Sequence, residues 1–251
     1  MRILFSHDEM RALHLTHVPR PTRSPAYLAE RERVWQGRVT AARIKGEHLW
    51  NGELYTIEHL LQWDETHILL AMSSCEFKDV VFRVHTGLAV IAQTYGIAHL
   101  PQYVTVDCIP VTSNGHFIFG VRGSGTHVQA GKVGLIGGTL NKDEMTVSSF
   151  ADIVTFMQKE VHEETALVCH VDELTLFALN VFRGKYEFLF TFDAHVHSAE
   201  VRDLNTPEEF AYLMATDLAG AMAIDNGLDA VRYAKTYLPQ LWQAIQHRET
   251  R

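Results

Sequence analysis

Apolar residues recur at steps of three and four in the middle of the chain, which is the spacing of one face of a helix. The members of this stripe are Val147, Phe150, Val154, Met157 and Val161. They predict an amphipathic helix whose apolar side packs on a core. Its last turns carry three glutamates, Glu160, Glu163 and Glu164.

The first hundred residues show helical and strand-like patterns in turn. A charge-rich amphipathic pattern over 26–45 predicts a helix, with Ser24 as its cap and Pro25 in its first turn. Two apolar runs, 54–63 and 68–72, are separated by a short polar turn and predict a hairpin. The spacing over 77–95 suits one helix or two short ones.

Strand patterns dominate the next part of the chain. The predicted strands are 103–112, 117–122, 174–182 and 186–194, the last two forming a hairpin. Thr206 and Pro207 predict a helix start, and 228–247 predicts a closing helix that Pro239 would kink. These elements indicate an α/β or α+β fold with a mixed sheet between helices. We expect an N-terminal α/β region over 1–100 and a second domain over 101–251.

Composition narrows the class of protein. The chain has 251 residues, 47% of them hydrophobic, and no apolar run approaches the length of a membrane span. A formal charge of −8 argues against a nonspecific nucleic-acid binder, which needs a basic stripe. Cys75, Cys108 and Cys169 are odd in number and far apart, which is typical of free thiols in a reducing compartment. We therefore expect a cytoplasmic protein without membrane or nucleic-acid partners.

The three glutamates are a candidate site for a metal ion. Glu160 and Glu164 are four residues apart, so their like charges repel on a helix by a few tenths of a kcal/mol. Several carboxylates without a His or Cys cluster suit a hard cation such as Mg²⁺. At about 100° per residue, Glu164 lies near the edge of the apolar stripe, Glu160 further round and Glu163 almost opposite. The alternative is a solvated acidic face, with Lys159 and Glu163 as an ordinary surface pair.

The sequence around these glutamates resembles the Nudix box, the signature of hydrolases that cleave a nucleoside diphosphate linked to another group. That motif runs Gly, five residues, Glu, seven residues, then Arg-Glu-apolar-x-Glu-Glu-x-Gly-apolar. The matching positions are Gly138, Glu144, Lys159, Glu160, Val161, Glu163, Glu164 and Leu167. The chain departs from the motif in having Lys159 for Arg, Ala166 for Gly, and fourteen residues rather than seven between Glu144 and Lys159. The insertion is either a longer loop or about two added helical turns.

The resemblance implies a Nudix fold and a role for each matching residue. The implied metal ligands are Glu160, Glu163 and Glu164, holding Mg²⁺ with Mn²⁺ as a substitute. The implied catalytic residues are Glu144, Lys159, Glu163 and Glu164. The Gly137-Gly138 turn would let the backbone approach substrate phosphates, and Arg122, at the end of a predicted strand, would meet a phosphate through its planar fork. Glu208 and Glu209 are candidates for the general base on position alone.

Two classes of function remain open. The first is Mg²⁺-dependent hydrolysis of the diphosphate bond in a nucleoside diphosphate derivative. A UDP-sugar is the leading candidate substrate, because the order of predicted elements along the chain is similar to that of the two-domain Nudix enzymes that hydrolyse UDP-glucose and UDP-galactose. The second is a Nudix-fold protein that has lost turnover and binds a nucleotide as a sensor or regulator. The N-terminal region would contact the nucleotide substrate, bury a sheet face, or form a homodimer contact.

Overall fold

The computed structural model describes residues 2–3, 12–63, 67–123, 131–182, 184–204, 210–228, 231 and 234–249. The chain folds as two compact units, each made of three segments. Unit 1 consists of Met1–Thr105, Thr139–Ile153 and Leu179–Glu187. Unit 2 consists of Val106–Gly138, Val154–Ala178 and Phe188–Arg251. The division predicted at residue 100 follows chain order and stays a prediction.

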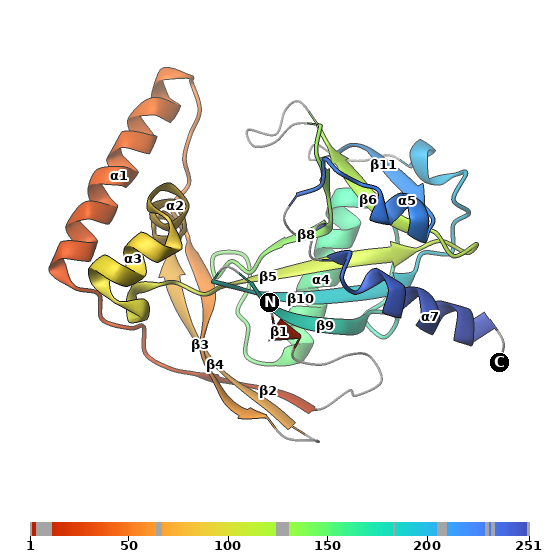
Figure 1. Ribbon diagram of the computed structural model, residues 1–251, viewed down its shortest axis with the longest axis horizontal. Helices are drawn as coiled ribbons and strands as arrows, with labels where there is room; N and C mark the ends of the chain where they lie inside the picture. Colours follow the sequence, from red (N-terminus) through yellow and green to blue (C-terminus); the bar gives the residue numbers. More distant parts are fainter. Residues whose placement is uncertain are drawn as a thin grey trace. The chain divides into compact units, whose positions relative to one another are not determined.

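In its described residues, unit 1 combines three α-helices and one short 3-10 helix with β-strands (Figure 1). Its helical elements are α1 (Pro25–Ile44), α2 (Phe77–Thr86), α3 (Leu88–Tyr95) and η2 (Ile97–His99). Its strands are β1 (Arg2–Ile3), β2 (Ala12–His17), β3 (Glu53–Trp63) and β4 (His67–Glu76), together with ends of β5 (Tyr103–Val111), β9 (Thr175–Phe182) and β10 (Lys185–Asp193). β3 pairs antiparallel with β4 and with the start of β5, whereas β2 runs parallel to β4. The predicted hairpin and the predicted helices of this region are confirmed.

Local chemistry explains where α1 begins. The Ser24 hydroxyl accepts a hydrogen bond from the Tyr27 amide at 3.3 Å, and Pro25 occupies the first helical position. A serine cap satisfies an amide that has no partner within the helix, and proline has no amide to satisfy. The cap predicted from Ser24 and Pro25 is therefore confirmed.

A fully buried carboxylate ties α1 to α2 within unit 1. Asp79, in the first turn of α2, accepts hydrogen bonds from Arg31 at 2.8 Å, Arg20 at 2.9 Å and the Tyr27 hydroxyl at 3.0 Å. The Glu76 amide donates to the same carboxylate at 2.9 Å. Burial, and then the charge of Asp79, raise the pKa of Tyr27 far above its usual value. A buried charge is tolerated when it is paired and hydrogen-bonded in this way.

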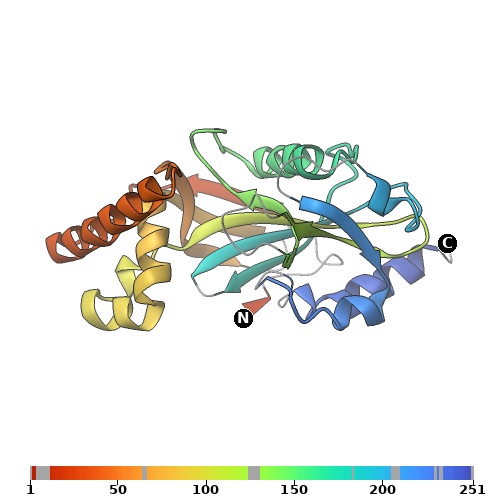
Figure 2. The same ribbon diagram turned by 90° about the horizontal axis from the view of Figure 1, so that it is seen from above.

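Unit 2 is a sheet with helices on both of its faces. Its further elements are β6 (Phe117–Arg122), β7 (Val133–Gly134), β8 (Ile136–Thr139), α4 (Phe150–Thr165), η3 (Val201–Asp203), β11 (Phe210–Thr216), α5 (Leu218–Met222) and α7 (Leu238–Glu249). β6 pairs with β11, with β7 and with the end of β5, and β10 lies between β9 and β5. Figure 2 shows α4 on one face of these strands and α5 and α7 on the other. The predicted mixed sheet between helices is confirmed.

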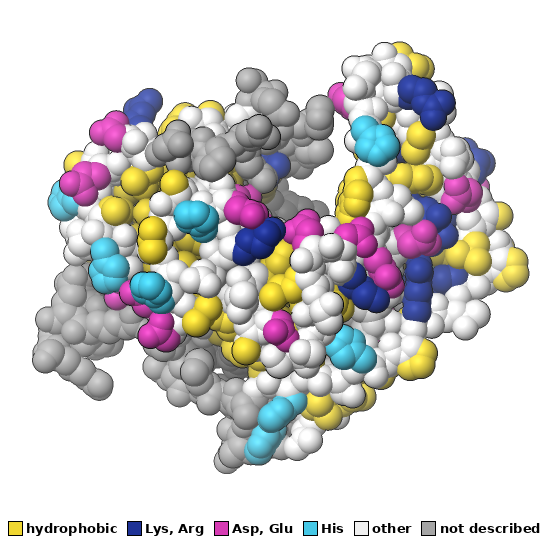
Figure 3. Space-filling view, turned by 180° about the vertical axis from the view of Figure 1, so that it is seen from behind, with side chains coloured by type: hydrophobic (Ala, Val, Ile, Leu, Met, Phe, Trp, Pro, Cys, Tyr) yellow, Lys and Arg dark blue, Asp and Glu magenta, His cyan; other side chains and the backbone are white. Residues whose placement is uncertain are grey.

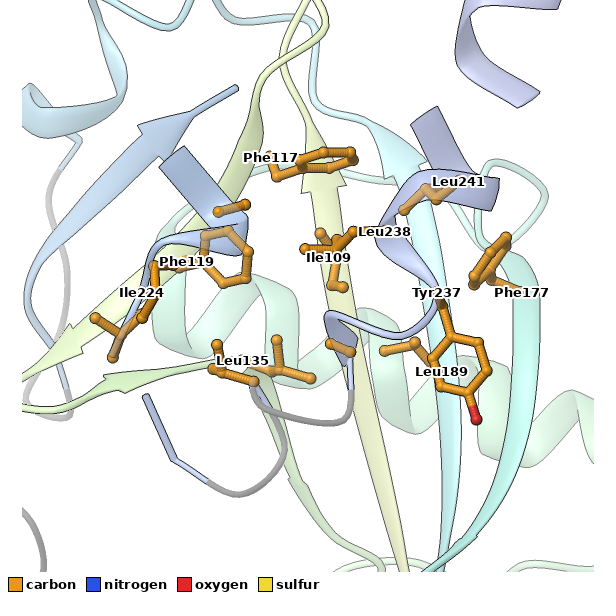
Figure 4. Close-up of a cluster of buried hydrophobic side chains, with 14 of the residues drawn as sticks. Ile109, Phe117, Phe119, Leu135, Phe177, Leu189, Ile224, Tyr237, Leu238 and Leu241 are labelled. Atoms are coloured by element: carbon orange, nitrogen blue, oxygen red, sulfur yellow. The ribbon is translucent and has the colours of Figure 1, made fainter. Parts of the chain in front are cut away.

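The sheet face under α5 and α7 carries the main core of unit 2. Its side chains come from strands β5, β6, β7, β9 and β10, from α5 and α7, and from described residues between these two helices, and they interlock as Figure 4 shows. Its members include Phe117, Phe119, Phe177, Tyr237 and Leu241. Strands with such continuous apolar burial are typical of a sheet covered on both faces.

Two parts of the fold differ from the sequence prediction. Residues 205–209, which include the predicted helix start, lie outside the described residues, and the segment that follows them is strand β11. Its pairing with β6 shifts between Phe210 and Tyr212, and such a bulge breaks the alternation by which a strand is recognised. Pro239 does not kink a long helix, because α7 begins at Leu238 and the proline lies in its first turn.

The described surface carries both signs of charge, and the thiols are buried. On the face in Figure 3, the described Lys and Arg side chains lie beside Asp and Glu rather than in one continuous basic stripe. Cys75, Cys108 and Cys169 are free and buried. Over the described ranges, the chain contains no helix that is long and apolar enough to cross a membrane.

Candidate active site

The helix that carries the glutamates starts at a serine pair. The Asp152 carboxylate accepts hydrogen bonds from the amides of Ser148 and Ser149 at 2.9 and 2.8 Å, and from their hydroxyls at 2.9 and 3.0 Å. These bonds lower the pKa of Asp152 to about 2. They fix the first turn of α4 at Phe150. The residues inserted between Glu144 and Lys159 were expected to form either a longer loop or added helical turns, and they form both. Residues 145–149 precede α4, and residues 150–158 form its turns before Lys159.

The order of burial along α4 is the one predicted from the apolar stripe. Glu164 is only 7% exposed, the Glu160 side chain is 13% exposed, and the Glu163 side chain is 55% exposed. Met157 and Val161, from the stripe, are fully buried. Two of the three carboxylates are thus held on a packed flank of the helix, and the third points outward.

Both inward carboxylates face the glycine turn at β8. The Gly137 amide donates a hydrogen bond to Oε2 of Glu164 at 2.6 Å. A Cβ built on Gly138 would lie 2.5 Å from Oε2 of Glu160. The absence of a side chain at Gly138 is therefore what admits the Glu160 carboxylate to this position. The structure brings together these two glycines and two glutamates, which the sequence places more than twenty residues apart.

Lys159 and Glu163 form the surface pair that the alternative interpretation describes. The Lys159 ammonium lies 3.0 Å from Glu163 and 3.7 Å from Glu160. A pair exposed to this degree contributes at most about 1 kcal/mol to stability. Its effect is to place a positive charge beside two of the three box carboxylates.

Glu144 and Arg122 belong to different surroundings. Glu144 lies in unit 1, where its Oε1 accepts a hydrogen bond from the Asn141 amide group at 2.9 Å. Arg122 is the last residue of β6 in unit 2, opposite Phe210 of β11, and its backbone is hydrogen-bonded to Lys132 and Gly131. The catalytic role of Glu144 and the phosphate-binding role of Arg122 stay predictions. Glu208 and Glu209 lie outside the described residues.

The carboxylate oxygens at the glycine turn provide only part of the ligand set that a hard cation such as Mg²⁺ needs. Glu160 and Glu164 converge on the glycine turn, and carboxylate oxygens are the ligands that Mg²⁺ and Mn²⁺ prefer. Within the described ranges, however, no three His, Cys, Asp or Glu side chains are grouped closely enough to hold a metal ion. Glu163 would have to leave Lys159 and turn inward to complete the predicted set. The exposed side chain of Glu163 has the rotamer freedom for such a turn.

A pocket in unit 1 was not predicted from the sequence. It has a volume of about 420 Å³ and is lined by Trp50, Leu54, Phe77, Thr139, Asn141, Asp143 and Glu144. Its lining residues come from three segments of the chain, so no spacing in the sequence points to it. Glu144 is the one residue of this set that the motif had singled out.

The end of α4 explains one departure from the box. Ala166 follows the last residue of the helix and has φ +56°, the left-handed conformation that favours glycine. This is the position where the resembled motif has Gly. Ala166→Gly should therefore raise the free energy of unfolding by about 1 kcal/mol, because a Cβ is strained in this conformation. Urea titration followed by circular dichroism measures the change.

Ala29→Gly is the matched control for that substitution. Ala29 is exposed within α1, where the backbone is an ordinary right-handed helix, so glycine should lower the free energy of unfolding by about 0.5–1 kcal/mol. Opposite signs at the two positions are the expected result. A loss of stability in Ala166→Gly would show that the left-handed backbone is not strained by alanine.

Solved structures of MutT and Nudix proteins are similar to part of this chain. The MutT protein from Methanosarcina mazei Go1 has 16% identity and a TM-score of 0.37, over 60% of this chain and 96% of its own. A mutT/nudix family protein from Listeria innocua has 18% identity and a TM-score of 0.41, over 59% and 96%. The NUDIX domain of Shewanella oneidensis NrtR, solved with ADP ribose, has 14% identity and a TM-score of 0.42, over 56% and 88%. No family profile and no curated protein sequence matches the chain. At these identities and TM-scores the likeness covers part of the chain and assigns it to no family.

Proposed function

We propose that this protein hydrolyses the diphosphate bond of a nucleoside diphosphate derivative and that the reaction depends on Mg²⁺. The observation that carries the proposal is the meeting of Glu160 and Glu164 at the Gly137-Gly138 turn of unit 2. Two carboxylates beside a backbone without side chains, one of them fixed by the Gly137 amide, provide a place where a cation and a phosphate can be bound together. The resemblance of this segment to the Nudix box supplies the reaction class.

Each residue at the turn has a definite task in this proposal. The hydrogen bond from the Gly137 amide fixes the orientation of the Glu164 carboxylate. Gly138, which has no side chain, admits the Glu160 carboxylate, and the turn is the part of the backbone that a phosphate would approach, as the resemblance implies. Glu163 joins Glu160 and Glu164 after leaving Lys159, and Glu144 orients the set, as the resemblance implies. A bound Mg²⁺ would lower the pKa of an attacking water and neutralise charge on the phosphate oxygens.

The substrate is expected to be a nucleotide joined to a second group through its diphosphate. UDP-sugars are the first compounds to examine, because the order of elements predicted over most of the chain resembles that of two-domain Nudix enzymes acting on them. The N-terminal region then has the task of holding the nucleotide. Arg122 would bind a phosphate oxygen, and Mn²⁺ would replace Mg²⁺ with activity retained.

A panel of nucleotide derivatives tests this function. UDP-glucose, GDP-mannose, CDP-choline and ADP-ribose are each incubated with the protein, with Mg²⁺ in one series and with EDTA in the other. The expected result is release of the nucleoside monophosphate from at least one compound, with loss of release in EDTA. Turnover of none of them, or equal turnover in EDTA, would contradict the proposal.

The second candidate is a protein that binds a nucleotide without turnover. It is favoured by the pairing of Glu163 with Lys159, which leaves two carboxylates rather than three at the glycine turn. The same panel separates the candidates when binding is measured by calorimetry beside hydrolysis. A ligand that binds with micromolar affinity and stays intact in Mg²⁺ would identify a sensor or regulator.

A further inference from the structure

The walls of the unit 1 pocket are held by the backbone. The segment after the glycine turn runs beside the start of β3, where the Tyr55 amide donates to the Leu140 carbonyl at 3.0 Å and the Lys142 amide donates to the Glu53 carbonyl at 2.8 Å. The Phe77 amide donates to the Gly52 carbonyl at 2.9 Å on the other side. The pocket of about 420 Å³ is therefore bounded by segments that are hydrogen-bonded to one another.

One wall is an aromatic platform. The Trp50 ring lies directly over Gly52, where a Cβ would come within 1.4 Å of the indole. It also packs on Phe77, with ring centroids 5.8 Å apart and ring planes at 43°. Although it is supported in this way, Trp50 is 41% exposed. A large aromatic side chain that is backed by the protein, lines a pocket and is partly exposed is suited to stacking against a planar ligand.

The polar lining of the pocket is acidic. Its polar lining residues are Asp143, Glu144, Asn141 and Thr139, and none of the described lining residues is basic. The lysines next to lining residues in sequence are Lys78 and Lys142, which pair with Glu76 at 3.0 Å and with Glu53 at 3.2 Å. A phosphate would be repelled from such a lining. The suitable ligand is a neutral ring whose edge donates hydrogen bonds.

We propose that this pocket binds a nucleobase that carries an exocyclic amino group, with the ring stacked on Trp50 and the amino group donating to the Asp143 carboxylate. Carboxylates accept hydrogen bonds from exocyclic amines of bases, and an ionised Asp has only acceptors to offer. Guanine, adenine and cytosine have such an amine. Uracil has a single ring N–H between two carbonyl groups. These carbonyl oxygens are acceptors, and they would lie unfavourably against the carboxylates of the lining.

The inference rests on the proposed function in one respect: the planar ligand is taken to be a nucleobase because the proposed substrate is a nucleotide derivative. It narrows that function to substrates with an amino-bearing base, and the uracil of a UDP-sugar is the base that the pocket accepts least well. Because nucleosides contain no diphosphate, their binding is measured independently of hydrolysis.

Calorimetric titration with guanosine, adenosine, cytidine and uridine tests the pocket. At least one amino-bearing nucleoside should bind at least tenfold more tightly than uridine. Trp50→Ala should weaken binding of that nucleoside about tenfold or more, since stacking on an aromatic side chain contributes roughly that factor per base. Trp50→Phe should recover part of the loss, which separates lost stacking from a folding defect. Glu30→Gln, on the surface of α1, is the control and should change nothing.

Asp143→Asn tests the selectivity. It replaces one carboxylate oxygen by an amide without a change of size, so the preference for the amino-bearing nucleoside should fall to about twofold while uridine binding stays the same. Uridine binding as tightly as the others, or affinities unchanged in Trp50→Ala and Asp143→Asn, would overturn the inference. Absence of any nucleoside binding would overturn it too. If nucleosides bind as expected and no diphosphate is hydrolysed, the proposed function fails and the pocket stands. If hydrolysis proceeds without regard to the base, the pocket alone is refuted.

Discussion

Glu164→Gln should lower kcat at least about 10³-fold in the hydrolysis assay while the protein remains folded. Glu164 is the most buried of the three box glutamates, and its carboxylate is fixed by the Gly137 amide. Glutamine removes the negative charge that a divalent ion requires. A bound metal ion contributes several kcal/mol to stabilisation of the transition state, and each 1.36 kcal/mol corresponds to a factor of ten in rate.

The fold should tolerate this substitution, because the glutamine carbonyl oxygen can still accept the hydrogen bond from the Gly137 amide. The bond changes from charge-assisted to neutral, which lowers the free energy of unfolding by about 1 kcal/mol. Glu30→Gln makes the same chemical change on the exposed face of α1 and should leave kcat unaffected. Retention of Mg²⁺-dependent hydrolysis in Glu164→Gln would remove Glu164 from the proposed mechanism.

A second readout does not depend on turnover. Mg²⁺ should raise the Tm of the wild-type protein, because an ion that binds only the folded state stabilises it by mass action. The rise should be smaller in Glu164→Gln and unchanged in Glu30→Gln. Equal Tm shifts in all three proteins would show that the ion does not bind at the glycine turn.

The local pattern was sufficient to predict the arrangement of the glutamates on α4. Rotation by about 100° per residue places Glu164 beside the apolar stripe and Glu163 opposite it, and the observed exposures follow that order. Helix geometry depends on neighbours in sequence, so the order of burial can be derived from residue numbers alone. Patterns between sequence neighbours also predicted α1, from its amphipathic spacing and its cap, and the hairpin of β3 and β4, from two apolar runs joined by a polar turn.

Contacts between residues far apart in sequence could not be derived from the local pattern of apolar and polar residues. β2 pairs with β4 through residues more than fifty positions apart, and no alternation marks β11 because of its bulge. The pocket joins Trp50 and Phe77 to Asn141 and Asp143, and backbone hydrogen bonds between β3 and the segment after the glycine turn bring these parts of the chain together. Such contacts follow from the packing of the whole chain rather than from propensity or spacing.

The two glycines of the turn have different physical requirements. Gly137 has φ +139°, and a Cβ on it would lie 2.1 Å from the carbonyl oxygen of Val106. The obstacle is backbone in a neighbouring strand, which cannot move aside. At Gly138 the obstacle is the end of the Glu160 side chain, which is flexible. The first glycine is therefore required by the fold, and the second by the position of a carboxylate.

Gly137→Ala should accordingly lower the free energy of unfolding by about 4 kcal/mol or more, since strain at an unusual φ and overlap with backbone act together. Gly138→Ala should lower it by about 1 kcal/mol or less and instead displace Glu160, so that the Mg²⁺ concentration for half-maximal hydrolysis rises about tenfold or more. Urea titration gives the first quantity and a Mg²⁺ titration of hydrolysis gives the second. Similar losses of stability in the two variants would mean that Glu160 is held as rigidly as the strand, because only an immobile carboxylate could oppose a methyl group as strongly as the backbone of Val106 does.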